Sequence, residues 1–285
     1  MREYLNADGH ANTVRLLQDV FKGPICVIEG DSDRKVYIRL FDRQQVRHVC
    51  AGPFVKAVVQ RLNATATAGV FGIMDADFCR LDGNCSSTDN LFLTDYHDLE
   101  VELLFSGAFS KALDELGSEE KLKQATGDKG VDALREVLLG AAAPLGALRW
   151  LNKLNSYRLD FEKIDFSKFI DATSLVGDTT RMCNLVCQRS EQYNLIQSTP
   201  TEVAIVLDGN PDQKQLCCGH DMVEVMGLTL RKCWGSKNAS DVSEERLSQS
   251  LRLAYSKEDF TATLLYQALR NWQQAHPDYR LFVEE

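Results

Sequence analysis

Short apolar runs rich in β-branched residues alternate with helix-like stretches through the first third of this chain, and no other feature constrains its fold as much. The runs occupy residues 24–30, 46–52, 69–78 and 91–95. Between the first two, residues 31–42 place Val36, Leu40 and Phe41 on one helical face. Strands that alternate with helices predict an α/β fold with a mostly parallel sheet flanked by helices.

The rest of the 285-residue chain has mainly helical patterns. Apolar periodicity predicts helices over 97–116, 131–155, 178–190, 219–235, 244–255 and 259–275. The stretch 157–171 fits a strand or a short helix equally well. We therefore expect an α/β core over residues 1–117, followed by a helical C-terminal part over 118–285 that docks on it.

Acidic side chains follow three of the four predicted strands. Glu29 ends the first strand, Asp75 and Asp77 end the third, and Asp95 ends the fourth. In open parallel sheets the functional crevice lies beyond the carboxyl ends of the strands. The sequence therefore predicts that these carboxylates meet at one edge of the sheet.

Carboxylates gathered at one edge would repel one another, and a divalent cation would relieve that repulsion. On an extended chain, Asp75 and Asp77 should point the same way. Asp33 begins the helix after Glu29 and can reach back toward the same edge. Carboxylate oxygens are the ligands that Mg²⁺ prefers, so we expect bound Mg²⁺ or Mn²⁺.

The candidate residues fall into two groups. The predicted metal ligands are Glu29, Asp33, Asp75, Asp77, Asp98 and Glu100. Of these, Glu29, Asp75, Asp77 and Glu100 are also the predicted catalytic residues, and Asp95, His97 and His220 are further candidates. Several of them also have structural interpretations: Asp75 and Asp77 could cap a turn, Asp31 is the better helix cap in its segment, and His220 could be a structural histidine.

Metal-assisted phosphodiester cleavage suits this set of residues, with Glu29 as a general acid or base. Three other functions remain open. A non-catalytic regulatory subunit could use the same acids to bind a partner, and a primase-like enzyme would transfer nucleotides. A glycosyltransferase with a DxD motif would leave Glu29 unexplained.

The formal net charge of −9 argues against a general nucleic-acid binder with a basic surface. A nuclease with this charge would need a homodimer or a basic partner surface to hold its substrate. No apolar run is long enough for a membrane span, and the first twenty residues resemble an amphipathic helix rather than a signal peptide. We therefore expect a cytoplasmic protein whose nine cysteines are reduced thiols.

Two motifs resemble those of toprim domains, which occur in topoisomerases, primases and OLD-type nucleases. They are "EGDSD" (29–33) at a strand end and "MDAD" (74–77) after a later strand. The segments "TDYHDLEVELL" (94–104) and "GHDMVEVMGL" (219–228) are similar to a bacterial group of toprim proteins that carry a helical appendage. Members of that group are often encoded beside an ABC-type ATPase in phage-defence loci.

This resemblance carries expectations of its own. It implies a toprim-like sheet, with Glu29 as the toprim glutamate, Asp75 and Asp77 as the metal-binding aspartates, and Glu100 as the acid found after the fourth strand in OLD-like versions. It implies a nucleic-acid substrate, which is RNA (specifically tRNA) for the defence effectors and DNA for generic OLD-like nucleases. It also implies an ABC-type ATPase partner, because this chain has no ATPase half of its own.

Overall fold

The computed structural model describes residues 6–85 and 88–283, and the chain divides into two compact units. The α/β unit comprises the described residues of Met1–Ala76, Cys85–Leu99 and Tyr255–Glu285, and the helical unit comprises Asp77–Asn84 and Glu100–Ala254. This division differs from the predicted one after residue 117. The helices that follow Leu99 pack within the helical unit, and the last segment of the chain returns to the α/β unit.

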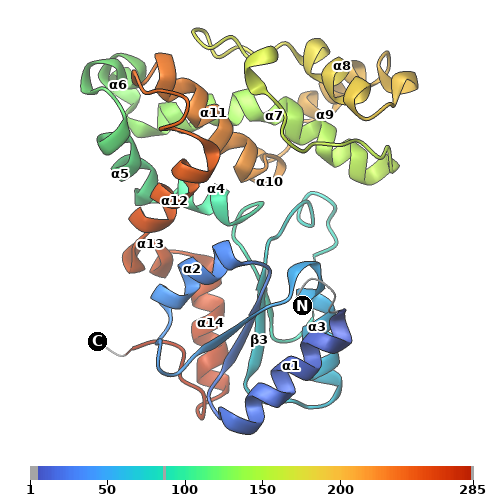
Figure 1. Cartoon of the computed structure of the whole chain (residues 1–285), viewed down its shortest axis with the longest axis vertical. Coiled ribbons are helices and arrows are strands. Elements are labelled where there is room, and N and C mark those ends of the chain that lie inside the picture. The colour runs from blue at the N-terminus through green and yellow to red at the C-terminus, as the bar shows by residue number, and fades with distance from the viewer. Residues whose placement is uncertain (1–5, 86–87, 284–285) are drawn as a thin grey trace. The chain divides into compact units, whose positions relative to one another are not determined.

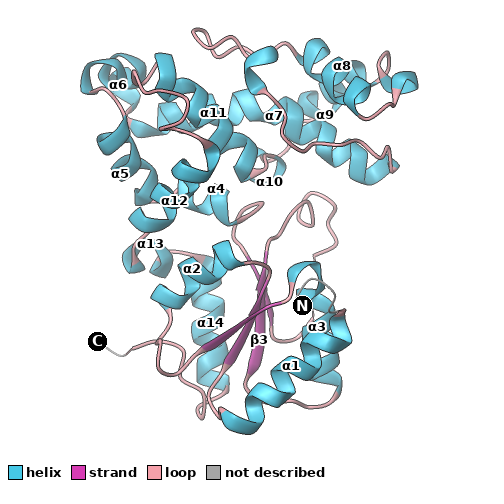
Figure 2. Cartoon of the chain, in the orientation of Figure 1, coloured by secondary structure: helices cyan, strands magenta, loops and turns pink. Residues whose placement is uncertain are grey.

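A four-stranded, all-parallel sheet forms the centre of the α/β unit (Figure 2). Its strands are β1 (Ile25–Ile28), β2 (Arg47–Cys50), β3 (Val70–Met74) and β4 (Leu91–Leu93). They are arranged in the order β2-β1-β3-β4, with Ile25 of β1 in register with Val70 of β3. The predicted α/β fold class is confirmed, and the architecture is consistent with a toprim-like sheet.

Helices α1 (Ala7–Val20) and α3 (Val55–Ala64) pack on one face of this sheet (Figure 1). The 3₁₀ turn η2 (Gly52–Phe54) leads into α3. Gly72 of β3 allows α3 to approach closely, because a Cβ atom there would lie 2.7 Å from a methyl group of Val59. Apolar side chains from both helices and all four strands form one buried cluster, and its removal from water supplies the main stabilisation of this face.

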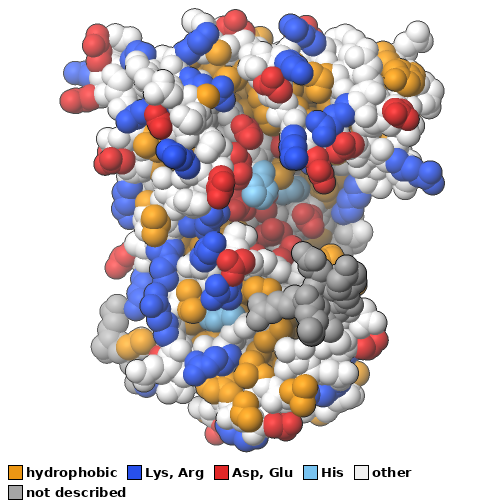
Figure 3. Space-filling view, in the orientation of Figure 1, with side chains coloured by type: hydrophobic (Ala, Val, Ile, Leu, Met, Phe, Trp, Pro, Cys, Tyr) orange, Lys and Arg blue, Asp and Glu red, His pale blue; other side chains and the backbone are white. Residues whose placement is uncertain are grey.

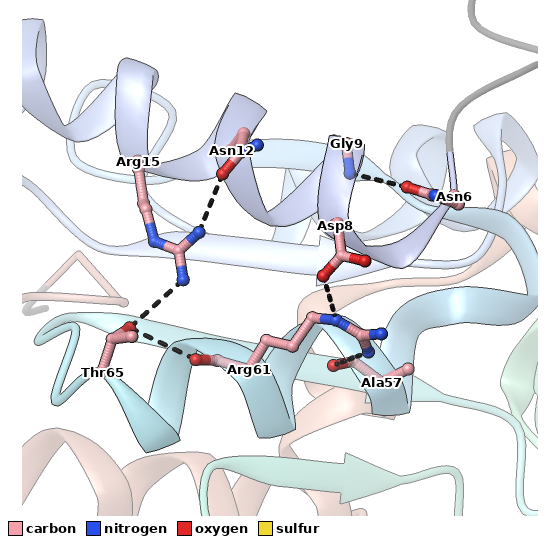
Figure 4. A network of polar contacts seen from close by, with 8 residues as sticks. All are labelled: Asn6, Asp8, Gly9, Asn12, Arg15, Ala57, Arg61 and Thr65. Carbon is pink, nitrogen blue, oxygen red and sulfur yellow. Dashed lines mark hydrogen bonds and ion pairs between the residues drawn. The ribbon is translucent and has the colours of Figure 1, made fainter.

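Polar contacts also join α1 to α3 (Figure 4). Arg61 of α3 donates to Asp8 of α1 at 2.5 Å. Arg15 of α1 donates to the hydroxyl of Thr65 at 3.4 Å, just after the end of α3. Asn6 caps α1 by accepting from the Gly9 N–H at 3.0 Å. These exposed contacts fix the register of the two helices and add little to stability.

The opposite face of the sheet is covered by α2 (Asp31–Leu40) together with α13 (Lys257–Thr261) and α14 (Leu264–Ala275) from the end of the chain. Aromatic rings dominate this contact. The Phe71 ring of β3 lies 5.8 Å from that of Phe41 and 5.0 Å from that of Trp272. Trp272 also donates its indole N–H to Asn90 at 2.8 Å. The last segment is therefore part of the core of the α/β unit.

The helical unit is built around the long helix α7 (Val131–Asn155). Its other helices are α4 (Leu99–Leu104), α5 (Gly107–Leu116), α6 (Glu119–Thr126), α8 (Thr179–Arg189), α9 (Thr199–Asp208), α10 (Gln213–Leu216), α11 (Gly219–Lys232) and α12 (Glu244–Ala254), with 3₁₀ turns η3 (Gly127–Lys129), η4 (Phe166–Lys168) and η5 (Tyr193–Leu195). Gly146 of α7 is needed for close packing, because a Cβ atom there would lie 2.5 Å from the Leu216 carbonyl oxygen.

Two predicted helices are each divided in two. The helix predicted over 97–116 ends at Leu104 and a second begins at Gly107, because the Ser106 hydroxyl caps the new helix by accepting from the Ala108 N–H at 3.0 Å. The helix predicted over 259–275 is divided at Thr263, whose hydroxyl accepts from the Tyr266 N–H at 3.0 Å. In both places a hydroxyl side chain competes with the helix for the backbone.

The prediction that all the cysteines are reduced is wrong for two of them. Cys79 and Cys85 are disulfide-bonded, whereas the other seven are free thiols. Within the described residues, no helix is both long and apolar enough to cross a membrane.

Candidate metal centre

The first pair of predicted ligands meets at the carboxyl edge of the sheet. Glu29 directly follows β1 and Asp75 directly follows β3, and these two strands are neighbours. The Glu29 Oε1 atom accepts a hydrogen bond from the Asp75 backbone N–H at 3.1 Å. Both residues are partly exposed. The two acids therefore lie together at the end of the sheet, as the sequence predicts.

Further hydrogen bonds fix the chain that leaves β3. Asp75 Oδ1 accepts from the N–H of Leu99, the first residue of α4, at 3.1 Å. The buried Thr94 hydroxyl accepts from the Ala76 N–H at 3.0 Å and donates to the Tyr96 carbonyl at 2.9 Å. Sequence reasoning missed Thr94, although its place at the end of the fourth predicted strand was a usable signal.

Asp33 closes the turn that follows Glu29. Its Oδ2 atom accepts from the N–H of Gly30, the N-cap residue of α2, at 2.7 Å. Asp31 is the first residue of the helix and forms ion pairs with Arg34 at 2.8 Å and Lys35 at 3.2 Å. The interpretation of Asp31 as the cap is therefore wrong, and Asp33 supports the turn instead.

The charge of Asp33 affects the pKa of a cysteine in β1. Burial raises the pKa of the Cys26 thiol in β1 well above its usual value, and the charges of Asp33 and Cys50 raise it further. Cys50, at the end of β2, donates its S–H to the Gly30 carbonyl at 3.5 Å. The Cys26 thiol thus stays protonated close to the negative charge of Asp33.

The chemistry of these donors suits a divalent cation. Glu29, Asp33 and Asp75 offer hard carboxylate oxygens from two turns of a single unit, although the ligand atoms of these three described residues do not all lie within 4.8 Å of one another. Each of them accepts a backbone N–H that holds its orientation, which is the role that outer hydrogen bonds have around metal ligands. A carboxylate offers about four lone-pair positions, so one such bond does not exhaust its capacity.

Asp95 supports a helix from the far end of the chain. Its two carboxylate oxygens accept from the N–H groups of Leu264 and Leu265 at 2.7 and 2.9 Å, which caps α14. His97 and Asp98 precede α4 and are 4% and 5% exposed. Thus all three of these candidates belong to the α/β unit, with Asp95 at a helix terminus.

Asp77 does not have the geometry that its spacing predicts. Strand β3 ends at Met74, and Asp77 has a left-handed backbone with φ of 47°. The expectation that Asp75 and Asp77 point the same way along an extended chain is therefore wrong. The side chain of Asp77 is exposed, and the residue belongs to the helical unit.

The remaining two candidates also lie in the helical unit. Glu100, in the first turn of α4, is 5% exposed and lies 3.7 Å from the guanidinium of Arg252 in α12. His220 is exposed at the start of α11, and its Nδ1 atom lies 2.9 Å from Glu244 Oε1. The hydrogen bond from His220 is the main reason why the pKa of Glu244 is lowered.

The residue after His220 has a structural role that sequence reasoning did not foresee. Asp221 is buried and accepts two hydrogen bonds from Arg149 of α7, at 2.7 and 2.8 Å. Arg149 also lies over the ring of Phe161, with its guanidinium carbon 4.5 Å from the centroid. This ion pair links α7 to α11.

No protein-family model matches the chain, and no curated protein matches it either.

Proposed function

We propose that this chain is a divalent-metal-dependent nuclease of the toprim, OLD-like kind that hydrolyses phosphodiester bonds in nucleic acid. One observation carries the proposal. Glu29 and Asp75 follow neighbouring parallel strands, and the Glu29 carboxylate holds the Asp75 backbone at 3.1 Å. This pair lies at the carboxyl edge of a parallel sheet, which is where α/β enzymes bind their ligands.

Glu29, Asp33 and Asp75 are the residues that would hold Mg²⁺ or Mn²⁺. When bound, such a cation lowers the pKa of water and stabilises the charge on a leaving oxygen. The protein contributes the orientation of the ligands: Glu29 positions the turn after β3, and Asp75 links that turn to α4. Asp77, Glu100 and His220 remain candidates from the helical unit.

The identity of the substrate rests on the resemblance of the motifs. The motifs resemble those of AriB, the effector of the PARIS defence system, and this resemblance favours RNA, specifically tRNA, over DNA. The same resemblance favours a cytoplasmic toxic effector controlled by an ABC-type ATPase partner. The net charge of −9 favours a homodimer or a basic partner surface that helps to bind the substrate.

Amide substitutions separate a metal-binding role from a structural one. Glu29→Gln and Asp75→Asn keep an oxygen that accepts the backbone N–H, but they remove the negative charge. We expect RNA recovered from cells that express either variant, together with the ATPase partner, to show at least 100-fold less cleavage than the unsubstituted chain (an order-of-magnitude expectation for lost electrostatic stabilisation). Sequencing of the RNA ends measures this.

Asp31→Asn is the matched control. It removes an acid from the same turn, but one that is exposed and ion-paired with Arg34. Cleavage by this variant should remain at the level of the unsubstituted chain. Calorimetry with Mn²⁺ gives a readout independent of activity: uptake should be lost in Glu29→Gln and kept in Asp31→Asn. Full cleavage by both Glu29→Gln and Asp75→Asn would favour the regulatory subunit instead.

A further inference from the structure

A recess lies within the α/β unit, and neither Glu29 nor Asp75 lines it. It has a volume of about 680 Å³ and is formed by the end of α2, by α13 and α14, and by the segment that follows α14. Its described lining residues are Leu40, Lys257, Glu258, Phe260, Thr261, Tyr266, Arg270, Phe282 and Val283. The recess can therefore admit a group as large as a nucleobase with its sugar.

Aromatic rings form one wall of this recess. The Tyr266 ring lies 5.4 Å from that of Phe260 and 4.9 Å from that of Phe282. Phe260 and Phe282 are 2% and 7% exposed, whereas Tyr266 is partly exposed. Two buried rings thus hold a third against the recess, and a flat ligand can stack on a ring held in this way.

The recess also carries positive charge. Lys257 and Arg270 both line it, and neither has an ion pair or a side-chain hydrogen bond to any residue that the structure describes. Among its described lining residues, Glu258 is the only acid. The two cations are therefore available to an anionic ligand beside the aromatic wall.

The positive charge continues along α2. The segment from Arg34 to Arg47 holds five basic residues and a single acid, Asp42. Two of the five, Arg34 and Lys35, are ion-paired with Asp31. Figure 3 shows Lys and Arg side chains gathered over α2 and α13. Burial lowers the pKa of Arg39, and the nearby charge of Arg43 lowers it further. Arg39 and Arg43 lie on either side of Leu40 in the sequence, and Leu40 lines the recess.

We propose that this surface binds single-stranded nucleic acid, with an unpaired base stacked on Tyr266, its neighbouring phosphates on Lys257 and Arg270, and the strand continuing along the arginines of α2. A basic track with an aromatic platform is the arrangement by which proteins hold single strands. The inference rests on the proposed function, since the strand would be the substrate of the nuclease. It also provides a local basic surface in a chain whose net charge is −9.

The test measures binding without cleavage. Every protein carries Glu29→Gln, the buffer contains EDTA, and the probe is a fluorescein-labelled 12-nucleotide RNA without secondary structure, followed by fluorescence anisotropy. Tyr266→Leu should weaken binding roughly tenfold through lost stacking. Lys257→Gln combined with Arg270→Gln should weaken it at least fivefold and lower the slope of log K against log salt by about 1.4, since each lost phosphate contact removes about 0.7.

Lys22→Gln combined with Lys56→Gln is the matched control, because it removes the same charge from exposed positions of the same unit that do not line the recess. This variant should bind with nearly unchanged affinity. Circular dichroism checks that each variant is folded.

Four outcomes would overturn the inference: no binding by the parent protein, equal binding by the recess variants, an equal loss in the control, or equal competition by polyglutamate or free AMP. The two proposals can fail separately. If Glu29→Gln abolishes cleavage while the recess variants bind normally, this inference alone fails. If the recess binds RNA but no metal-dependent cleavage occurs, the proposed function alone fails.

Discussion

Several carboxylates of the two units are held in different ways. In the helical unit, buried acids lie beside cationic side chains: Asp221 accepts two hydrogen bonds from Arg149, and Glu100 lies 3.7 Å from Arg252. In the α/β unit, Glu29, Asp75 and Asp95 accept from backbone N–H groups. The first arrangement joins helices, whereas the second fixes the direction in which a carboxylate points.

This difference has a consequence for charge. A guanidinium cancels the charge of its partner, and removing either partner leaves the other buried and uncompensated. A backbone N–H orients a carboxylate without cancelling its charge, so that charge can still act on a cation or a substrate. Substitutions that change charge but keep shape should therefore affect stability in the helical unit and activity in the α/β unit.

The largest expected effect on stability is that of Asp221→Asn. It leaves Arg149, whose side chain is 23% exposed, without its anionic partner. We expect the free energy of unfolding to fall by about 3 kcal/mol, as measured by urea denaturation. Glu29→Gln is the comparison from the other unit and should cost less than about 1 kcal/mol. Similar losses from both substitutions would contradict the distinction between the units.

His48 of the α/β unit extends the comparison to pH. Burial, together with the charges of Arg34 and Arg47, lowers the pKa of His48 to about 4 from an ordinary value of 6.5. The unfolded chain therefore takes up this proton at a higher pH than the folded chain. His48 stabilises the folded state fully above pH 6.5. The free energy of unfolding should fall by up to roughly 3 kcal/mol as the pH decreases from 6.5 to 4.

His48→Phe is the variant that checks this pH dependence. The His48 ring already stacks on Phe41 at 5.9 Å, and its buried Nε2 atom has no hydrogen-bond partner among the described residues. Phenylalanine should therefore fit at this position. In urea denaturation, the variant should lack the part of the fall in unfolding free energy between pH 6.5 and 4 that His48 causes. An unchanged pH profile would show that other groups cause that fall.

A smaller effect is expected from Asp95→Ala. The N–H groups of Leu264 and Leu265 would both lose their acceptor, which should cost about 1–2 kcal/mol. Hydrogen exchange should accelerate at these two amides first. Asp178→Ala is the counterpart in the helical unit, where Asp178 caps α8 with a single bond of 2.9 Å to the Arg181 N–H, so its cost should be lower. Slow exchange at Leu264 in Asp95→Ala would contradict the capping role.

The sheet and half of the site could be predicted from the sequence. Parallel strands place their carboxyl ends together whatever the details of packing, so the meeting of Glu29 and Asp75 follows from the strand pattern alone. Asp77 could not be placed in this way, because the strand ends at Met74 and Asp77 itself has a left-handed backbone. The point where a strand ends depends on hydrogen bonds such as that from Ala76 to Thr94, which periodicity does not report.

Long-range contacts were also beyond the sequence pattern. Asp95 caps a helix that begins 169 residues further along the chain, and Trp272 packs on Phe71 in the middle of the sheet. The helix that Asp95 caps is also the one that contains Trp272. Its periodicity indicates an apolar face but does not indicate what that face packs against. The predicted boundary after residue 117 assumed that neighbours in sequence stay neighbours in space, and the returning segment breaks that assumption.

The return of residues 255–283 to the sheet also affects the order in which the two units can fold. On the ribosome, the helical unit has all of its residues once Ala254 has emerged, whereas the α/β unit still lacks the helices that cover one face of its strands. Domains fold as their residues become available during translation. The aromatic recess therefore cannot form, and of α2, α13 and α14 only α2 can cover its face of the sheet, until the residues up to Phe282 have been synthesised.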